Sequence, residues 1–211
     1  MNNPGSSSSD RVQDRTERLN KNCYCVTLDL PSLREAMEQE AGEPAFFETF
    51  IRPKAHLFSH VPVFLSATTV DEMRAIAVAV ETTAQLEAYK TAVLSWAPEI
   101  AWADHGPIGA LMGYDFHLGE DGPRLIEINT NAGGAFLNAF LARAQRACCA
   151  EMDIPPTLLS FEDAAFRMFQ NEWIRQRGTG APERIAIVDD NPPEQYLYPE
   201  FVLARQVLAA R

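Results

Sequence analysis

The chain has 211 residues and a formal net charge of −11, with 18 Lys and Arg against 29 Asp and Glu. This acidic balance argues against a nucleic-acid-binding protein, because nucleic-acid phosphates require a basic face. An apolar share of 46% is enough for the core of one full domain. No apolar run reaches the length of a membrane span, and no secretory signal pattern begins the chain. We therefore expect a cytoplasmic protein with reduced cysteines.

Residues 1–20 are rich in Ser, Asn and mixed charge, and this composition predicts a disordered N-terminus. A first structured unit is expected over 21–177. It opens with a helix over 31–41, which Gly42 and Pro44 end. Three aromatic side chains that follow are predicted core anchors: Phe46, Phe47 and Phe50.

Residues 50–60 form a basic stretch interrupted by Pro53. Arg52 and Lys54 are candidates for binding an anion, because an acidic protein needs local cations to hold one. The alternative is a solvated connector. The spacing of His56 and His60 fits a zinc pair only on a regular helix, which proline disfavours.

Residues 61–65 are apolar and predict a short strand. Thr69 and Glu72 have the spacing of a capping box and predict the start of a helix. A second helix is expected over 85–96, and Pro98 ends it. These two helices are interpreted as packing elements.

Residues 110–118 and 124–129 predict two antiparallel strands joined by a turn. If the loop is a three-residue turn over 120–122, Asp115 lies opposite Glu127 and Gly113 lies opposite Asn129. Side chains alternate along a strand and directly opposed residues share a face. The same register pairs Gly119 with Pro123 and His117 with Leu125. The pattern therefore predicts one polar face, made by Asp115, Glu127, Asn129 and His117.

Two facing carboxylates are costly unless a cation lies between them or one is protonated. With the amide oxygen of Asn129, the ligand set is all oxygen, which suits Mg²⁺ or Mn²⁺. The loop that follows precedes a helix predicted over 136–147, and its backbone N–H groups are a candidate anion cradle. The loop candidates are Thr130, Asn131, Gly133 and Gly134. The alternative is a polar hairpin on a solvated face.

A helix is predicted over 160–176, followed by a Gly-rich linker over 177–183. Residues 184–188 end in a short, continuously apolar strand pattern over 185–188, and a helix is expected over 194–210. This βα unit is typical of the start of a doubly wound sheet.

The hairpin sequence with Asp115 and then Leu-Ile-Glu127-Ile-Asn129-Thr-Asn-Ala-Gly-Gly resembles the metal-binding end of the ATP-grasp ligases. The Tyr-Asp-Phe strand followed by Glu-x-Asn is similar to the glutathionylspermidine-synthetase-like branch. Residues 185–200 resemble the first βα unit of the pre-ATP-grasp domain in circularly permuted members. The resemblance implies an α/β (α+β) fold with a hairpin flanked by helices, followed over 184–211 by the incomplete start of a Rossmann-like domain.

By this resemblance, Asp115, Glu127 and Asn129 hold magnesium, and the loop that follows borders the phosphates of ATP. The expected reaction joins a small carboxylate to an amine, a thiol or a peptide-like substrate through an acyl phosphate. His117, Arg52 and Lys54 are further candidates near the reacting groups.

The only lysines are Lys21, Lys54 and Lys90, so the nucleotide-clamping lysines of the family are expected in a part that this chain lacks. We interpret the chain as the metal-binding half. The alternatives are a non-catalytic ATP-grasp remnant or interaction module and a metal-dependent hydrolase. The oligomeric state stays open, with a homodimer among the alternatives.

Overall fold

The computed structural model describes residues 8–23, 28–54, 56–59, 61–119, 121–145 and 160–211. In chain order, its elements are α1 (Ser8–Asn22), α2 (Leu30–Ala41), the π-helix η1 (Phe47–Ile51), α3 (Ala67–Ala84), α4 (Glu87–Leu94), the 3-10 helix η2 (Glu99–Trp102), β1 (Gly113–Gly119), β2 (Gly122–Asn129), α5 (Ala135–Ala144), α7 (Phe161–Arg177), the 3-10 helix η3 (Pro192–Glu194) and α8 (Tyr198–Ala209). The described part therefore combines helices with a two-stranded antiparallel sheet, as the predicted α+β mixture requires.

A helical layer holds the core. Helices α2, α5 and α8 pack on one another, and α7 packs on α5 and α8. The side chains of Phe46, Met37 and Leu203 are fully buried there, beside Phe136 and Phe140 of α5. The predicted core role of Phe46 is confirmed, and Phe47 and Phe50 pack against the same cluster. Burial of these apolar surfaces is the main stabilising contribution that the layer offers.

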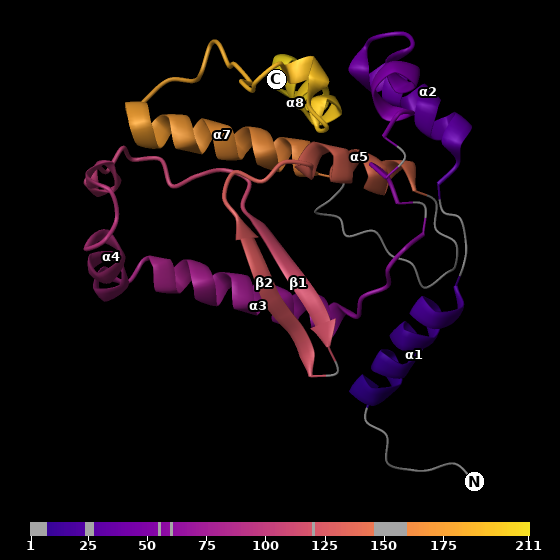
Figure 1. The fold of residues 1–211 in the computed structure, drawn as a ribbon, viewed down its shortest axis with the longest axis horizontal. Helices are drawn as coiled ribbons and strands as arrows, with labels where there is room; N and C mark the ends of the chain where they lie inside the picture. The colour runs from indigo at the N-terminus through magenta and orange to yellow at the C-terminus, as the bar shows by residue number, and fades with distance from the viewer. Residues whose placement is uncertain (1–7, 24–27, 55, 60, 120, 146–159) are drawn as a thin grey trace.

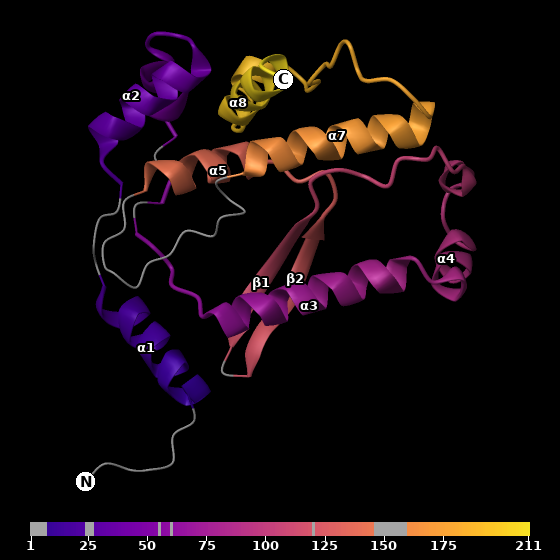
Figure 2. The same ribbon diagram turned by 180° about the vertical axis from the view of Figure 1, so that it is seen from behind.

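The hairpin of β1 and β2 extends from this layer toward α3 (Figures 1 and 2). One of its faces meets α3, where the Tyr114 hydroxyl donates a hydrogen bond to Glu81. This contact and burial raise the pKa of Tyr114 to about 12. Phe116 and Leu125 are opposed on the same face and half-buried. Because side chains alternate, the polar residues of β1 point away from α3.

Helix α1 occupies Ser8–Asn22 and overlaps the segment over 1–20 for which we predict disorder. Charges four residues apart stabilise a helix, and Lys21 lies 3.4 Å from Glu17 in this way. Asn20 also ties α1 to the rest of the chain. Its amide exchanges hydrogen bonds of 2.9 and 2.7 Å with the backbone of Phe64.

Two local predictions near α3 are wrong. Ser66, not Thr69, is the N-cap, and its hydroxyl accepts a 3.0 Å hydrogen bond from the Thr69 N–H. The helix therefore begins three residues earlier than the capping box indicates. Residues 61–65 form no strand among the described residues, and Val63 is largely exposed. An apolar run needs a partner edge to become a strand, and this one meets none in the part of the chain that the structure describes.

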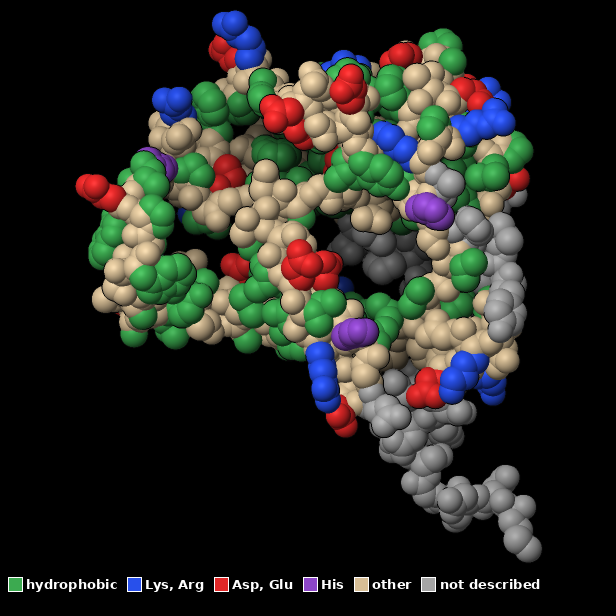
Figure 3. Space-filling model, viewed as in Figure 1, with side chains coloured by type: hydrophobic (Ala, Val, Ile, Leu, Met, Phe, Trp, Pro, Cys, Tyr) green, Lys and Arg blue, Asp and Glu red, His purple; other side chains and the backbone are tan. Residues whose placement is uncertain are grey.

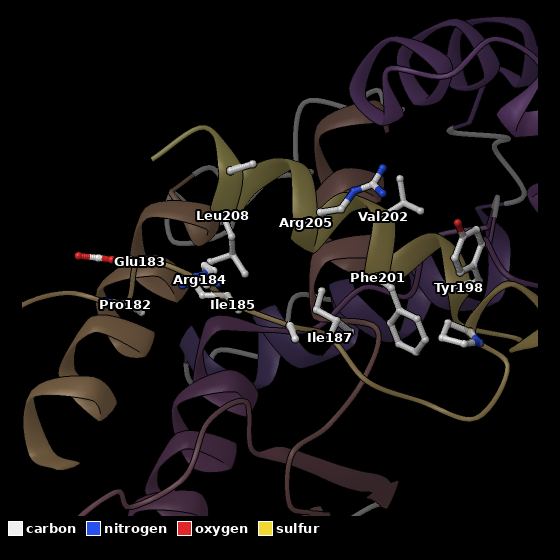
Figure 4. Close-up of a pocket in the computed structure, with 13 residues that line it drawn as sticks. Pro182, Glu183, Arg184, Ile185, Ile187, Tyr198, Phe201, Val202, Arg205 and Leu208 are labelled. Carbon is white, nitrogen blue, oxygen red and sulfur yellow. The ribbon is translucent and has the colours of Figure 1, made fainter. Parts of the chain in front are cut away.

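The apolar segment over 184–188 is not hydrogen-bonded into any sheet of the described structure. A groove of about 700 Å³ separates it from α8, with Phe201 and Leu208 turned toward it (Figure 4). Val188 is 86% exposed. By contrast, α8 packs into the same core as α2 and α5. The unit expected over 184–211 therefore shares its core with the preceding residues.

Three of the four cysteines that we expect to be reduced, Cys25, Cys148 and Cys149, lie outside the described residues, as do His60 and Glu120. Among the helices that the structure describes, none combines the length and the apolar character needed to cross a bilayer.

Candidate functional site

The hairpin register brings the predicted residues together, although the pairs of residues near the turn differ from the predicted ones. Asp115 lies opposite Glu127, and Gly113 lies opposite Asn129, as predicted. Nearer the turn, however, Gly119 pairs with Gly122 and His117 pairs with Arg124. The pairings predicted for Gly119 and His117 are therefore wrong.

A β-bulge explains this difference. The turn is one residue tighter than expected, and an irregularity in the ladder at Ile126 adds one residue to β2. The two changes cancel beyond the bulge, so the pairs from Asp115 onward keep the expected register. Gly122 has a φ of 99°, the left-handed conformation predicted for the end of this turn.

The polar face carries two exposed carboxylates and an amide. The Asn129 Nδ2 donates to Asp115 Oδ2 over 3.3 Å, and Glu127 faces Asp115 across the ladder. His117 and Arg124 continue this face toward the turn. Figure 3 shows acidic side chains over the middle of the hairpin, with a histidine and a basic side chain nearer the turn.

A hollow of about 620 Å³ adjoins the polar face. Asp115 and Asn129 line one side, and the loop after β2 lines another. Four of the predicted site residues thus meet the same space as Asp115, namely Asn129, Thr130, Asn131 and Gly133. Glu127 and Gly134 do not line this hollow. Most of the residues predicted to bind the metal or the phosphates therefore line this one hollow.

The fit of this face to a divalent cation depends on its donors. Among the described residues, no three His, Cys, Asp or Glu side chains gather around one point. The hairpin offers two carboxylates and one amide oxygen. Mg²⁺ is commonly held by one or two carboxylates, with water and phosphate oxygens completing its octahedron. The residues present therefore fit a magnesium ion shared with a phosphate ligand better than a cage built only of protein side chains.

The first turn of α5 already holds an anion of the protein itself. Its N-cap is Gly134, which has no side chain to accept the first helical N–H groups. The carboxylate of Glu200 from α8 accepts hydrogen bonds from the N–H groups of Phe136 (2.9 Å) and Leu137 (2.7 Å). Burial raises the pKa of Glu200, and these hydrogen bonds oppose the rise, together with those from Gly134 and Ala135.

The start of β1 is anchored in a similar way to α7. Glu172 Oε2 accepts hydrogen bonds from the N–H groups of Ile108 (2.8 Å) and Gly109 (2.9 Å). The Ala132 N–H donates to the Leu111 carbonyl over 2.5 Å, which ties the loop after β2 to the residues before β1. The end of the hairpin opposite its turn is thus tied to α7 through the residues before β1, and the loop after β2 is tied to those same residues.

Arg52 and Lys54 lie elsewhere, in a groove lined by α2 and η1. Arg52 pairs with Glu48 at 2.7 Å, and this hydrogen bond raises the pKa of Arg52. Lys54 Nζ donates to the carbonyls of Gln195 (2.9 Å) and Tyr196 (2.7 Å), and burial lowers its pKa. Both cations are therefore occupied by protein groups, and neither lines the hollow beside Asp115.

Sequence reasoning missed Arg124, Glu172 and Glu200. Arg124 is opposite His117 only because the turn is tight, and the turn length is not fixed by its composition. Glu172 and Glu200 accept hydrogen bonds from backbone groups 64 positions away in the sequence, and both lie on helices with ordinary amphipathic patterns. The one available signal is the glycine at the N-cap of α5, which requires an acceptor from another part of the chain.

No protein-family model, curated protein or solved structure matches this chain. The geometry of the hairpin and its hollow therefore carries the functional proposal.

Proposed function

We propose that the polar face of the hairpin binds Mg²⁺ or Mn²⁺ together with the phosphates of ATP, as the metal-binding portion of an ATP-grasp-like ligase. The observation that carries this proposal is the pairing of Asp115 with Glu127 and Asn129 next to a hollow of about 620 Å³. Carboxylate and amide oxygens on a solvated face leave coordination positions for phosphate oxygens.

Each residue has a separate role in this proposal. Asp115 and Glu127 supply anionic oxygens, and Asn129 supplies a neutral oxygen that adds no further repulsion. Thr130 and Asn131 line the hollow and orient the phosphates. An ion held by these residues would supply positive charge that offsets the charge of the ligand phosphates.

The reaction class follows from the family resemblance. ATP phosphorylates a small carboxylate, and an amine or thiol then displaces phosphate from the acyl phosphate, giving ADP and phosphate. We also propose that the protein is cytoplasmic.

A second candidate is a binding module of the same fold without turnover. It is favoured by Lys54, whose ammonium group is committed to two carbonyl oxygens and lies over the ring of Tyr196. Phosphoryl transfer needs cations around the transferred group. With Lys54 occupied, the described residues offer no lysine to the hollow beside Asp115.

Titration calorimetry of the 211-residue chain with ATP tests the proposal. We expect binding that requires Mg²⁺ and that weakens about tenfold or more in Glu127→Ala, as for a lost charge-assisted contact. Glu35→Ala, which removes an exposed carboxylate of α2, is the control and should bind as the wild type does. Absence of Mg²⁺-dependent binding in the folded wild type would refute the proposed ligase function. Binding with no ADP formed in the presence of carboxylates and amines would favour the second.

A further inference from the structure

Among the described residues, Glu200 is the one charged residue that is buried, with 5% of its surface exposed. Removing a carboxylate from water is costly unless hydrogen bonds replace the lost hydration. Its two oxygens receive the N–H groups of Phe136 and Leu137, one each, at 2.9 and 2.7 Å. These donors are the first N–H groups of α5, which no residue of the helix itself can satisfy.

The contact between Glu200 and the first turn of α5 lies next to the loop that lines the hollow. The loop over 130–134 leads directly into α5, and Gly134 has a φ of 90°. The Gly134 carbonyl accepts the Asn138 N–H over 2.9 Å, so the conformation of Gly134 is continuous with the first turn. A carboxylate that fixes the first turn therefore also fixes the end of the loop.

The residues just before Glu200 touch the same loop. Leu197 packs so closely on Gly133 that a Cβ added there would lie 2.7 Å from Leu197 Cδ1. Lys54 Nζ donates to the carbonyls of Gln195 and Tyr196 in the same segment. The segment that leads into α8 thus contacts the loop through Leu197 and is tied by Lys54 to the residues after η1.

The N-terminus of α5 is the place where the helix dipole and free N–H groups would attract a phosphate. Glu200 occupies that place with the chain's own negative charge. An external phosphate at the same N–H groups would have to displace a buried carboxylate and would meet its repulsion. The hollow over Asp115 and Asn129, in contrast, is open to a ligand.

We propose, resting on the function proposed above, that Glu200 is a positioning residue that holds the loop over 130–134 in its binding shape and directs the ligand phosphates to the hollow beside Asp115 and Asn129. The segment over 195–200 then serves the hairpin site although it lies far from it in the sequence. It makes the C-terminal helix a functional part of that site.

Hydrogen–deuterium exchange of the whole chain tests the positioning without any ligand. In Glu200→Gln, which keeps the shape of the side chain but not its charge, we expect the amides over 130–137 to exchange about tenfold faster. Val207→Ala, on the same helix and also buried, is the matched control for lost stability. It should speed exchange across α8 without singling out this loop. Equal protection of 130–137 in wild type and Glu200→Gln would overturn the proposal.

Titration with Mg²⁺ and ATP separates this proposal from the function on which it rests. We expect ATP affinity about tenfold weaker in Glu200→Gln and nearly unchanged in Val207→Ala. If the wild type fails to bind, the proposed function fails, while the exchange data still decide the positioning role. If the wild type binds and Glu200→Gln binds equally well, the positioning of the ligand site is refuted.

Discussion

Replacing Asp115 with Asn removes one of two carboxylates that face each other across the hairpin. Directly opposed side chains have Cβ atoms about 5 Å apart, and two unit charges at that distance in water repel by about 0.8 kcal/mol. Screening at 0.1 M salt reduces this to about half, because the Debye length is about 10 Å. The variant keeps an oxygen to accept the Asn129 amide. Without divalent cations it should therefore be more stable by about 0.5 kcal/mol.

Thermal unfolding in EDTA and then in Mg²⁺ measures this effect. For a chain of this size, about 0.5 kcal/mol corresponds to roughly 1–2 °C in Tm. Mg²⁺ should raise the Tm of the wild type, because a ligand that binds only the folded state stabilises it. The increase should disappear in Asp115→Asn, so that the order of the two Tm values reverses as Mg²⁺ is added.

Asp121→Asn is the matched control on the same hairpin. Asp121 pairs with Arg124 at 2.8 Å, so its loss relieves no repulsion and should leave Tm unchanged or slightly lower. It should also preserve the response to Mg²⁺. A lower Tm for Asp115→Asn in EDTA, or an equal Mg²⁺ response in both variants, would refute the reasoning.

Three further predictions concern the support of the site. Gly106→Ala should destabilise the chain by about 1–3 kcal/mol in urea unfolding, because Gly106 has a φ of 87° and an added Cβ would lie 2.7 Å from the Arg175 carbonyl oxygen. Leu203→Ala should cost about 2–5 kcal/mol, since Leu203 is 1% exposed in the core. The pKa of Glu200 is raised from its ordinary 4.5, so the folded chain holds this proton more tightly than the unfolded one. Unfolding free energy should therefore fall as pH rises from 4.5 through the folded pKa, and Glu200→Gln should lack this component.

The sequence predicted the pairing of Asp115 with Glu127 from strand alternation and a Gly-containing turn, but this pairing holds in the structure only because a bulge offsets the shorter turn. The helices over 30–41, 87–94 and 161–177 were also close to their predicted bounds. The turn length was not predictable, since Glu120-Asp121-Gly122 fits either a two-residue or a three-residue loop. The bulge at Ile126 compensated for the error, and only the residues near the turn changed partners.

What the sequence could not provide were contacts between distant segments. Glu200 has no local feature that separates it from an exposed helical glutamate, and only the packing of α8 on α5 explains its burial. The apolar run over 184–188 reads as a strand by composition, but strand formation also needs a neighbouring edge. Lys54 was predicted as a candidate for an anion, whereas tertiary contacts give it backbone carbonyls as partners.

Paramagnetic broadening by Mn²⁺ tests the central claim most directly. In amide spectra of the labelled chain, low concentrations of Mn²⁺ should first broaden residues 113–115 and 127–131. Glu127→Ala should abolish this selective effect, and excess Mg²⁺ should reverse it by competition. Broadening that begins at another acidic cluster, such as the one formed by Glu40 and Glu162 around Arg143, would contradict the assignment of the metal site to the hairpin.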